Sequence, residues 1–181
     1  MVNEVYIVQQ AVDGNQSAFT QLYDMYFDRI YRYIYIRIRK QAESEDLTQE
    51  VFIKALNAIG DYKIGKTPFA AWLFRIAHNQ VIDHVRKYAK NLETSLDEAP
   101  PSIGSEDPVA TTEQKFEIAE LNAAMMELPP AQQEVISLRF GGELSVAECA
   151  RTMHKSEGAV KALQHSAIVA LRKALGQGGV A

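Results

Sequence analysis

The residues best suited to contact nucleic acid share one side of a helical stretch in the first half of the chain. Arg75, Asn79, Arg86 and Lys90 follow one another at spacings of four, seven and four, which places them on one helix face. Trp72 precedes Arg75 by three residues, so its ring can share their rim. An Asn amide suits hydrogen bonding to base edges, and cationic side chains suit phosphates. This face is therefore a candidate contact surface for nucleic acid.

A second stretch, from Tyr31 to Lys40, interleaves aromatic and basic residues and allows two interpretations. Rings can stack on bases while cations meet phosphates, as on surfaces that bind single strands. A helix with Tyr and Ile at these spacings usually packs them inward instead, with arginine stems covering the edges of the core. Because many of these rings must belong to the core, the helix that carries Asn79 is the better candidate for contact.

The second half of the chain has the spacing of a helix-turn-helix. A short helix over Ser145–Met153 and a longer one over Glu157–Leu175 are separated by three residues, 154–156. The outward side of the longer helix carries Glu157, Lys161, Gln164, His165 and Arg172. Such a helix can enter the major groove of DNA. An ordinary helical hairpin with a solvated face fits the same spacing equally well.

We find no arrangement of residues that is typical of catalysis or metal binding. Asp83 lies three residues before Arg86, which is the spacing of an ion pair on a helix. Cys149 is the single cysteine, which excludes an intramolecular disulfide and a multi-cysteine zinc site, and its apolar helix face indicates a structural thiol. The four histidines form no HExxH pattern. We therefore expect no catalytic residue, metal, cofactor or small-molecule substrate.

The composition of the 181 residues is that of a globular protein: 47% are hydrophobic, 23% are charged, and the formal net charge is −4. The N-terminus lacks the basic and apolar regions of a signal peptide, and no run approaches the roughly 18 apolar residues of a spanning helix. A cytoplasmic location is therefore expected.

The acidic charge is concentrated in the middle of the chain. The segment Asn91–Gln114 contains six acidic residues and no basic one, together with three prolines. Such a composition offers little apolar surface to offset the entropy of ordering. We interpret residues 91–113 as a flexible linker between two domains, residues 1–90 and 114–181. The linker is either a passive tether or an acidic strand that can occupy a channel built for nucleic acid.

Apolar periodicity is helical on both sides of this linker, and no stretch alternates as a strand would. Asp46 is expected to be the N-cap of the third helix, with Gln49 in the capping-box position and Gly60 as its stop. The expected helices are residues 4–12, 17–40, 46–59, 68–90, 113–127, 131–140, 145–153 and 157–175. The fold class predicted is all-α, with two helical domains joined by the acidic linker.

Three segments resemble extracytoplasmic-function (ECF) sigma factors, the minimal members of the bacterial sigma-70 family. They are DLTQEVFIKAL at Asp46–Leu56, FAAWLFRIAHNQVIDHVRK at Phe69–Lys87, and LPPAQQEVISLRF and LSVAECARTMHKSEGAVKALQH within Leu128–His165. The resemblance covers nearly the whole chain, in order. It implies a promoter-recognising initiation factor that works with core RNA polymerase and does no covalent chemistry itself. It also implies that the linker threads the active-site channel of the polymerase.

The resemblance assigns roles to three groups of residues, with residues 1–90 as sigma region 2 and residues 114–181 as sigma region 4. The residues similar to the surface for the clamp helices of the β′ subunit are Asp46, Gln49, Glu50 and Phe52. Those similar to the part that opens the −10 element and captures an extruded base are Tyr62, Lys63, Trp72, Arg75, Asn79, Arg86 and Lys87. Those presented to the −35 element are Ser156, Lys161, Gln164 and His165.

The partners implied by the resemblance are core RNA polymerase, through its β and β′ subunits, promoter DNA and an anti-sigma factor. The sequence departs from the family at His154, where the turn commonly has Gly, and at Ser166, where similar sequences usually carry Arg. The alternative function is a stand-alone helix-turn-helix regulator that does not bind core polymerase. That alternative leaves the Asp46–Phe52 segment and the acidic linker unexplained.

Overall fold

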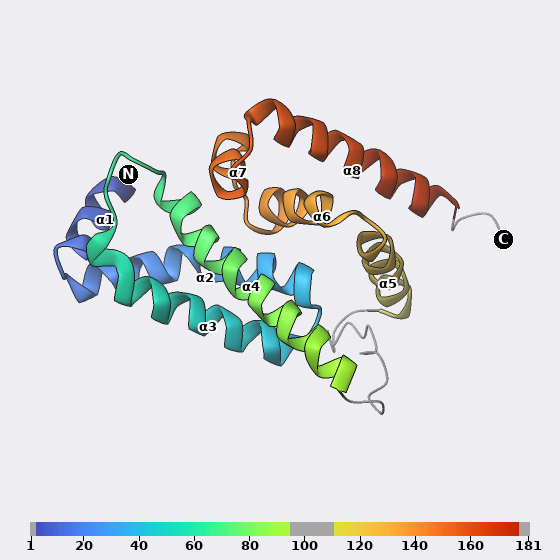
Figure 1. Ribbon diagram of the computed structural model, residues 1–181, viewed down its shortest axis with the longest axis horizontal. Helices are drawn as coiled ribbons and strands as arrows, with labels where there is room; N and C mark the ends of the chain where they lie inside the picture. Colours follow the sequence, from blue (N-terminus) through green and yellow to red (C-terminus); the bar gives the residue numbers. More distant parts are fainter. Residues whose placement is uncertain (1–2, 95–110, 178–181) are drawn as a thin grey trace.

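The computed structural model describes residues 3–94 and 111–177, and every regular element in those ranges is a helix (Figure 1). The predicted all-α class is therefore confirmed for the described part of the chain. The predicted linker, residues 91–113, overlaps described helices at both ends: residues 91–94 belong to a helix that runs to Thr94, and residues 112–113 begin the next helix. Residues 95–110 lie outside the described residues. Within the described ranges, no helix combines the length and the hydropathy needed to cross a lipid bilayer.

The first domain is a group of four helices. Its elements are α1 (Glu4–Val12), α2 (Gln16–Ile38), α3 (Gln41–Ala58), the 3₁₀ turn η1 (Ile59–Asp61) and α4 (Phe69–Thr94). Helices α2, α3 and α4 pack along one another, and α1 packs against α2 at one end (Figure 1).

The second domain consists of shorter helices around α8. Its elements are α5 (Thr112–Met126), α6 (Pro130–Ile136), the π-helical turn η2 (Ser137–Gly141), α7 (Val146–Met153) and α8 (Glu157–Gln177). The helix expected over residues 131–140 therefore changes to π-helical geometry after Ile136. Residues 127–129 separate α5 from α6, and Pro130 is the first residue of α6, a position at which proline is tolerated because its missing N–H would have no partner there.

Side-chain caps explain most of the helix starts. Asn15 accepts a hydrogen bond from the Ala18 amide at the start of α2, and Ser145 forms a complete capping box with Glu148 at the start of α7. Ser156 Oγ accepts from the Ala159 amide at 3.1 Å and so caps α8. These interactions leave fewer amide groups without partners at the helix ends.

The predicted N-cap at Asp46 is wrong. Helix α3 begins at Gln41, five residues earlier, and Asp46 is an exposed residue within it. The break from α2 lies at Arg39, which adopts a left-handed conformation with φ of 62°. A non-glycine residue is uncommon in that region of backbone space. Because the break lies at an arginine and not at Gly or Pro, the sequence gives no signal for it. Gly60 lies within η1 rather than acting as a left-handed stop.

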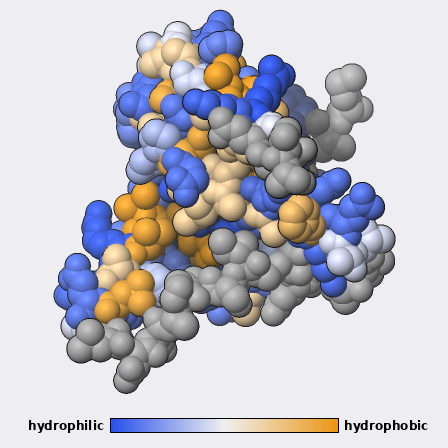
Figure 2. Space-filling model, turned by 90° about the vertical axis from the view of Figure 1, so that its right-hand side faces the viewer, coloured by the Kyte–Doolittle hydropathy of each residue, from blue (hydrophilic) through white to orange (hydrophobic). Residues whose placement is uncertain are grey.

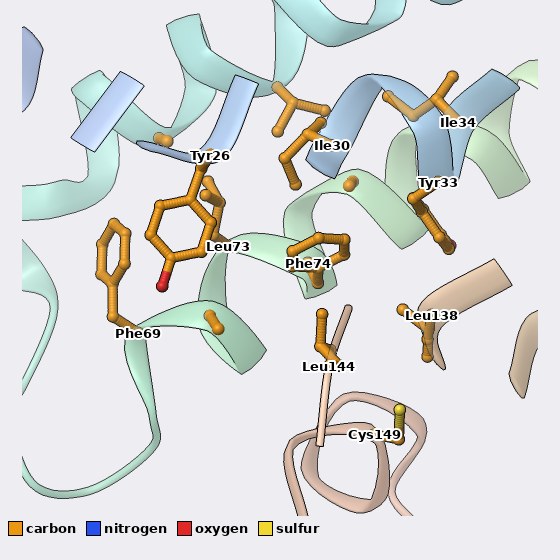
Figure 3. Packing of buried hydrophobic residues seen from close by; sticks show 14 of the residues in the cluster. Tyr26, Ile30, Tyr33, Ile34, Phe69, Leu73, Phe74, Leu138, Leu144 and Cys149 are labelled. Carbon is orange, nitrogen blue, oxygen red and sulfur yellow. The ribbon is translucent and has the colours of Figure 1, made fainter. Parts of the chain in front are cut away.

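The core is continuous across the two domains. Tyr33 and Phe74 of the first domain lie in one cluster with Leu138, Leu144 and Cys149 of the second, and all five are fully buried (Figure 3). The inward interpretation of the Tyr31–Lys40 stretch therefore holds for the ring of Tyr33.

Candidate polymerase and nucleic-acid interfaces

The residues predicted to contact polymerase lie on α3, and three of the four are exposed. Asp46, Gln49 and Glu50 share the solvent side of the helix, whereas Phe52 is only 5% exposed. The Phe52 ring packs against Tyr23, with ring centroids 4.7 Å apart. The helix thus presents the polar members of the predicted surface, and Phe52 supports the helix from inside the first domain.

Two hydrogen bonds hold the polar members of this surface in place. Gln49 Nε2 donates to the Tyr23 hydroxyl at 3.2 Å. Glu50 Oε2 accepts from Gln80 Nε2 at 2.8 Å, and Gln80 Oε1 in turn accepts from Lys54 Nζ at 2.7 Å. The Glu50 carboxylate is therefore oriented by α4 before any partner arrives, which lowers the entropic cost of binding.

Sequence reasoning missed two apolar residues on the outer side of α3. Ile53 is 59% exposed and Leu56 is 50% exposed. Ile53 follows Gln49 and Glu50 by four and three residues, so the three side chains are neighbours on the helix surface. Exposed apolar groups beside polar groups are typical of a protein-binding surface. The spacing of Leu47, Val51 and Ala55 in the sequence could have revealed these residues. Those three side chains fill the buried side of the helix, so Ile53 must point outward.

Three aromatic rings meet where α4 begins. Trp72 is half-buried, and its ring centroid lies 5.2 Å from that of Tyr62 and 5.5 Å from that of Phe69. Tyr62 is only 9% exposed, its hydroxyl donates to the Thr67 carbonyl at 2.5 Å, and burial together with the charge of Glu4 raises its pKa. Tyr62 therefore packs against Trp72 and is itself buried, whereas Lys63, the next residue after Tyr62, is exposed.

The rim predicted from Trp72, Arg75 and Asn79 is present on α4, and the second domain stands beside it. Arg75 Nη2 donates to the Arg151 carbonyl of α7 at 2.6 Å, while Asn79 is exposed. Between α4 and the second domain lies a cavity of about 460 Å³. Its polar lining includes Arg75, His78, Asn79, Glu134, His154 and Lys155. Burial and the positive charges of the neighbouring Arg37 and Arg75 lower the pKa of His78.

The remaining residues predicted for the −10 element lie further along α4. Arg86 and Lys87 are both exposed, about two helical turns beyond Asn79. Arg86 lies 3.9 Å from the Asp83 carboxylate, which is the ion pair that the spacing predicts. Because both partners are well exposed, this pair contributes little to stability and leaves Arg86 free to bind phosphate.

The helix-turn-helix is formed as the spacing predicts. Helix α7 ends at Met153, and the next residue, His154, has a left-handed φ of 53°, so a histidine holds the conformation that glycine usually supplies. Lys161, His165 and Ser166 lie exposed on α8. Two of the predicted contact residues already have partners: Ser156 caps α8, and Gln164 Oε1 accepts from Arg139 Nε at 2.9 Å.

An apolar groove lies between the end of α2 and helices α5, α6 and α8. It has a volume of about 350 Å³, and Leu121, Met125, Phe140 and Leu171 contribute to its walls. Apolar residues gather between hydrophilic ones on the face shown in Figure 2. Phe140 is 58% exposed, an unusual position for a large apolar side chain. In the part of the chain that the structure describes, no cluster of three His, Cys, Asp or Glu side chains is arranged to hold a metal ion.

Comparison with known proteins matches both domains and their order. Residues 22–91 match the family Sigma-70 region 2, and residues 124–173 match Sigma-70, region 4. The ECF RNA polymerase sigma factor BldN of Streptomyces coelicolor is 42% identical over 93% of this chain, which spans 64% of that protein. The ECF RNA polymerase sigma factor SigW of Bacillus subtilis is 32% identical over 93% of this chain and 94% of its own length.

The fold agrees with a solved structure of similar length. CnrH, in complex with the cytosolic domain of CnrY, superimposes with a TM-score of 0.75 at 24% identity, covering 96% of this chain and 97% of that one. The exposed polar faces of α3 and α4 thus lie within the part that matches Sigma-70 region 2, and that of α8 lies largely within the part that matches Sigma-70, region 4. This chain belongs to the ECF family of RNA polymerase sigma factors.

Proposed function

We propose that this sigma factor carries out promoter recognition with three separate surfaces. The exposed side of α3 binds core RNA polymerase, the Trp72 rim of α4 captures an unpaired base of the −10 element, and the outward side of α8 reads the −35 element. The observation that supports this most is the exposure of Asp46, Gln49 and Glu50 on a helix whose opposite side fills the core. A stand-alone DNA-binding regulator has no use for that surface.

The base-capture surface combines a ring, an amide and cations on one helix. Trp72 is braced from behind by Tyr62 and Phe69, so it offers a rigid ring on which a base can stack. Asn79 provides both donor and acceptor groups for a base edge. Extruding a base costs a few kcal/mol of unstacking, which such contacts can offset. The protein supplies binding energy, and bond formation remains with the polymerase.

The partners proposed are core RNA polymerase, promoter DNA and an anti-sigma factor. One structural neighbour supports the last of these: the sigma factor RpoE of Bartonella quintana was solved in complex with the anti-sigma factor NepR, with a TM-score of 0.67 and 22% identity. The apolar residues exposed on α3 and along the α5–α8 groove give this chain surfaces suited to a protein partner.

The test is transcription in vitro with purified core polymerase. Transcripts made in cells that overproduce the protein identify its promoters, and one such promoter serves as the template. We expect the protein to direct core polymerase to start at that promoter. A stand-alone regulator would bind the duplex without core and would add no specific start to it, and that result would overturn the proposal.

A further inference from the structure

Arg39, at the break between α2 and α3, has two features that its contacts with the described residues do not explain. Its backbone is left-handed, with φ of 62°, a conformation that is uncommon for a residue with a side chain. Its side chain is half-buried, and the Nε atom is shielded from water and has no acceptor in the part of the chain that the structure describes. Backbone strain of this kind gathers at sites that bind ligands.

The guanidinium of Arg39 also lacks a counter-ion. None of the ion pairs within residues 3–94 and 111–177 includes Arg39, whereas Arg37, two residues earlier, is paired with Glu134. Burial lowers the pKa of Arg39, because a cation withdrawn from water is disfavoured. Such a cation is costly unless a negative charge lies close to it. An anionic ligand would supply that charge.

Arg39 lines the apolar groove between the end of α2 and helices α5, α6 and α8. Apart from Arg39 and Arg172, every residue that lines this groove is apolar. Arg39 comes from the first domain and Arg172 from α8 of the second, so the groove receives positive charge from both. A ligand that fills it must therefore be largely apolar and must carry negative charge.

The size of the groove favours a single aliphatic chain over a protein helix. Its volume of about 350 Å³ lies at the lower end of the range of about 300–1,000 Å³ for small-molecule sites. One turn of an α-helix, about 10 Å across and about 5.4 Å long, fills roughly 420 Å³, which is more than the groove holds.

A carboxylate suits the charged end of such a ligand better than a phosphate. The planar guanidinium can form two parallel hydrogen bonds with either group. A phosphate carries a charge of about −1.5 to −2, however, and is more costly than a singly charged carboxylate to bring beside apolar walls. The lining of the groove thus matches an aliphatic carboxylate at both ends of the molecule.

We propose that the groove is a binding site for an aliphatic carboxylate, whose chain lies along the apolar walls and whose carboxylate pairs with Arg39 and Arg172. Phe140 is 58% exposed and supplies apolar surface for the chain to cover. The site uses none of the residues to which the promoter-recognition function is assigned. Either proposal can therefore fail without the other.

Calorimetric titration of the full chain with decanoate in neutral buffer tests the site. We expect saturable binding of one decanoate per chain, below the concentration at which decanoate forms micelles. Decanamide has nearly the same shape but no charge, and it should bind about tenfold more weakly because a hydrogen bond to a charged group is lost. Acetate, which has the carboxylate without the chain, should not bind in the same range.

Arg39→Gln tests the counter-ion directly. The affinity for decanoate should fall about tenfold, while the affinity for decanamide should stay the same. Arg39→Lys keeps the charge and should recover part of the affinity for decanoate. Arg151→Gln is the matched control, because it removes the same charge from an exposed position on α7 that does not line the groove. Far-UV circular dichroism and the Tm check that these variants are folded.

Two exposed phenylalanines of the second domain separate the groove from apolar surface in general. Phe140 lines the groove, whereas Phe116 on α5 is 65% exposed and does not. Phe140→Ser should weaken the binding of decanoate about tenfold, and Phe116→Ser should leave it unchanged. This pair tests the site even if Arg39→Gln fails to fold.

Several results would overturn the proposal. Equal affinities for decanoate and decanamide would show that no counter-ion is needed, and equal losses in Arg39→Gln and Arg151→Gln would show diffuse attraction. Equal losses in the two phenylalanine variants would show that decanoate coats exposed apolar surface. A dimer of the ligand-free chain that Phe140→Ser dissociates and Phe116→Ser does not would show that a second copy fills the groove instead. Promoter-specific transcription is measured without decanoate and tests the other proposal separately.

Discussion

At the scale of single residues, the environment of a side chain sets what it can react with or recognise. Cys149 lies in the core shared by the two domains, whereas Asn79 is exposed on the edge of a cavity. Both residues were singled out from the sequence, one as a structural thiol and one as a base reader. The structure now gives each a physical property that can be tested.

Cys149 should be inert in the folded protein. Burial raises its pKa to about 12, against the opposing effect of Arg139, and the side chain is inaccessible to reagents. Relative to an ordinary thiol of pKa about 9, its thiolate fraction at pH 8 falls about a thousandfold. We expect no reaction with a chromogenic disulfide reagent at pH 8 in buffer, and one equivalent of thiol after unfolding in guanidinium. A full equivalent released at once from the native protein would contradict this.

Replacing Asn79 by Ala should impair promoter opening and spare closed-complex binding, because the amide is proposed to read an unpaired base. A bidentate contact between Asn and a base is worth about 1–3 kcal/mol, so we expect at least a fivefold loss of open complex. Permanganate reactivity of thymines in the −10 region measures it. The control is Asn91→Ala, an exposed asparagine on the same helix. Equal reactivity in the Asn79 variant and wild type would remove Asn79 from base recognition.

At the scale of elements, the buried side of a helix was easier to predict than its ends. Leu47, Val51 and Ala55 are buried as their spacing predicts, yet α3 begins five residues before the expected Asp46. The reason is Arg39, which takes the left-handed conformation without being Gly or Asn. The π-helical turn after Ile136 was also missed; it ends at Gly141, where an added Cβ atom would lie 2.8 Å from Ile36 Cδ1 of the other domain.

Replacing Gln49 and Glu50 on α3 by Ala should weaken binding to core polymerase by about tenfold and leave helicity unchanged. Both side chains are exposed, but Glu50 also accepts a hydrogen bond from buried Gln80. We therefore also expect the free energy of unfolding of the double variant to fall by about 1 kcal/mol. Titration of labelled protein with core measures the affinity. The matched control replaces Gln41 and Glu45, an exposed pair near the start of the same helix that is joined by a 2.9 Å hydrogen bond. Equal affinities for the two double variants would exclude the surface around Glu50.

On α8, Ser166→Arg should strengthen binding to the −35 duplex. Ser166 is exposed beside His165, and one newly neutralised phosphate steepens the log–log salt dependence by about 0.9. Lys161→Ala should have the opposite effect. The full chain is suitable for this titration because α8 stays exposed when the domains are packed. Ser17→Arg adds the same charge to an exposed site on α2 and serves as the control. If Ser166→Arg changes neither affinity nor slope, its side chain points away from DNA.

At the scale of the whole molecule, the sequence predicted two domains correctly but not that they share one core. Periodicity reports the environment within a helix, whereas the contact between Phe74 and Gly142 joins residues far apart in the chain. Glu134 shows the same limit: its own helix gives no sign of its environment, and it is buried among three residues of the other domain. Long-range packing of this kind depends on shape complementarity, which no local pattern encodes.

A shared core should make the two domains unfold together. Trp72 is the only tryptophan and lies in the first domain, so its fluorescence follows that domain, while circular dichroism follows all helices. Val160→Ala in α8 removes fully buried apolar volume remote from α4, at a cost of about 2 kcal/mol. If folding is cooperative, the Tm detected by Trp72 falls by about 4–8 °C along with the dichroism. Val81→Ala in α4 should lower both signals in any case and is the reference. A Trp72 transition that ignores Val160→Ala would mean that the first domain is stable without the second.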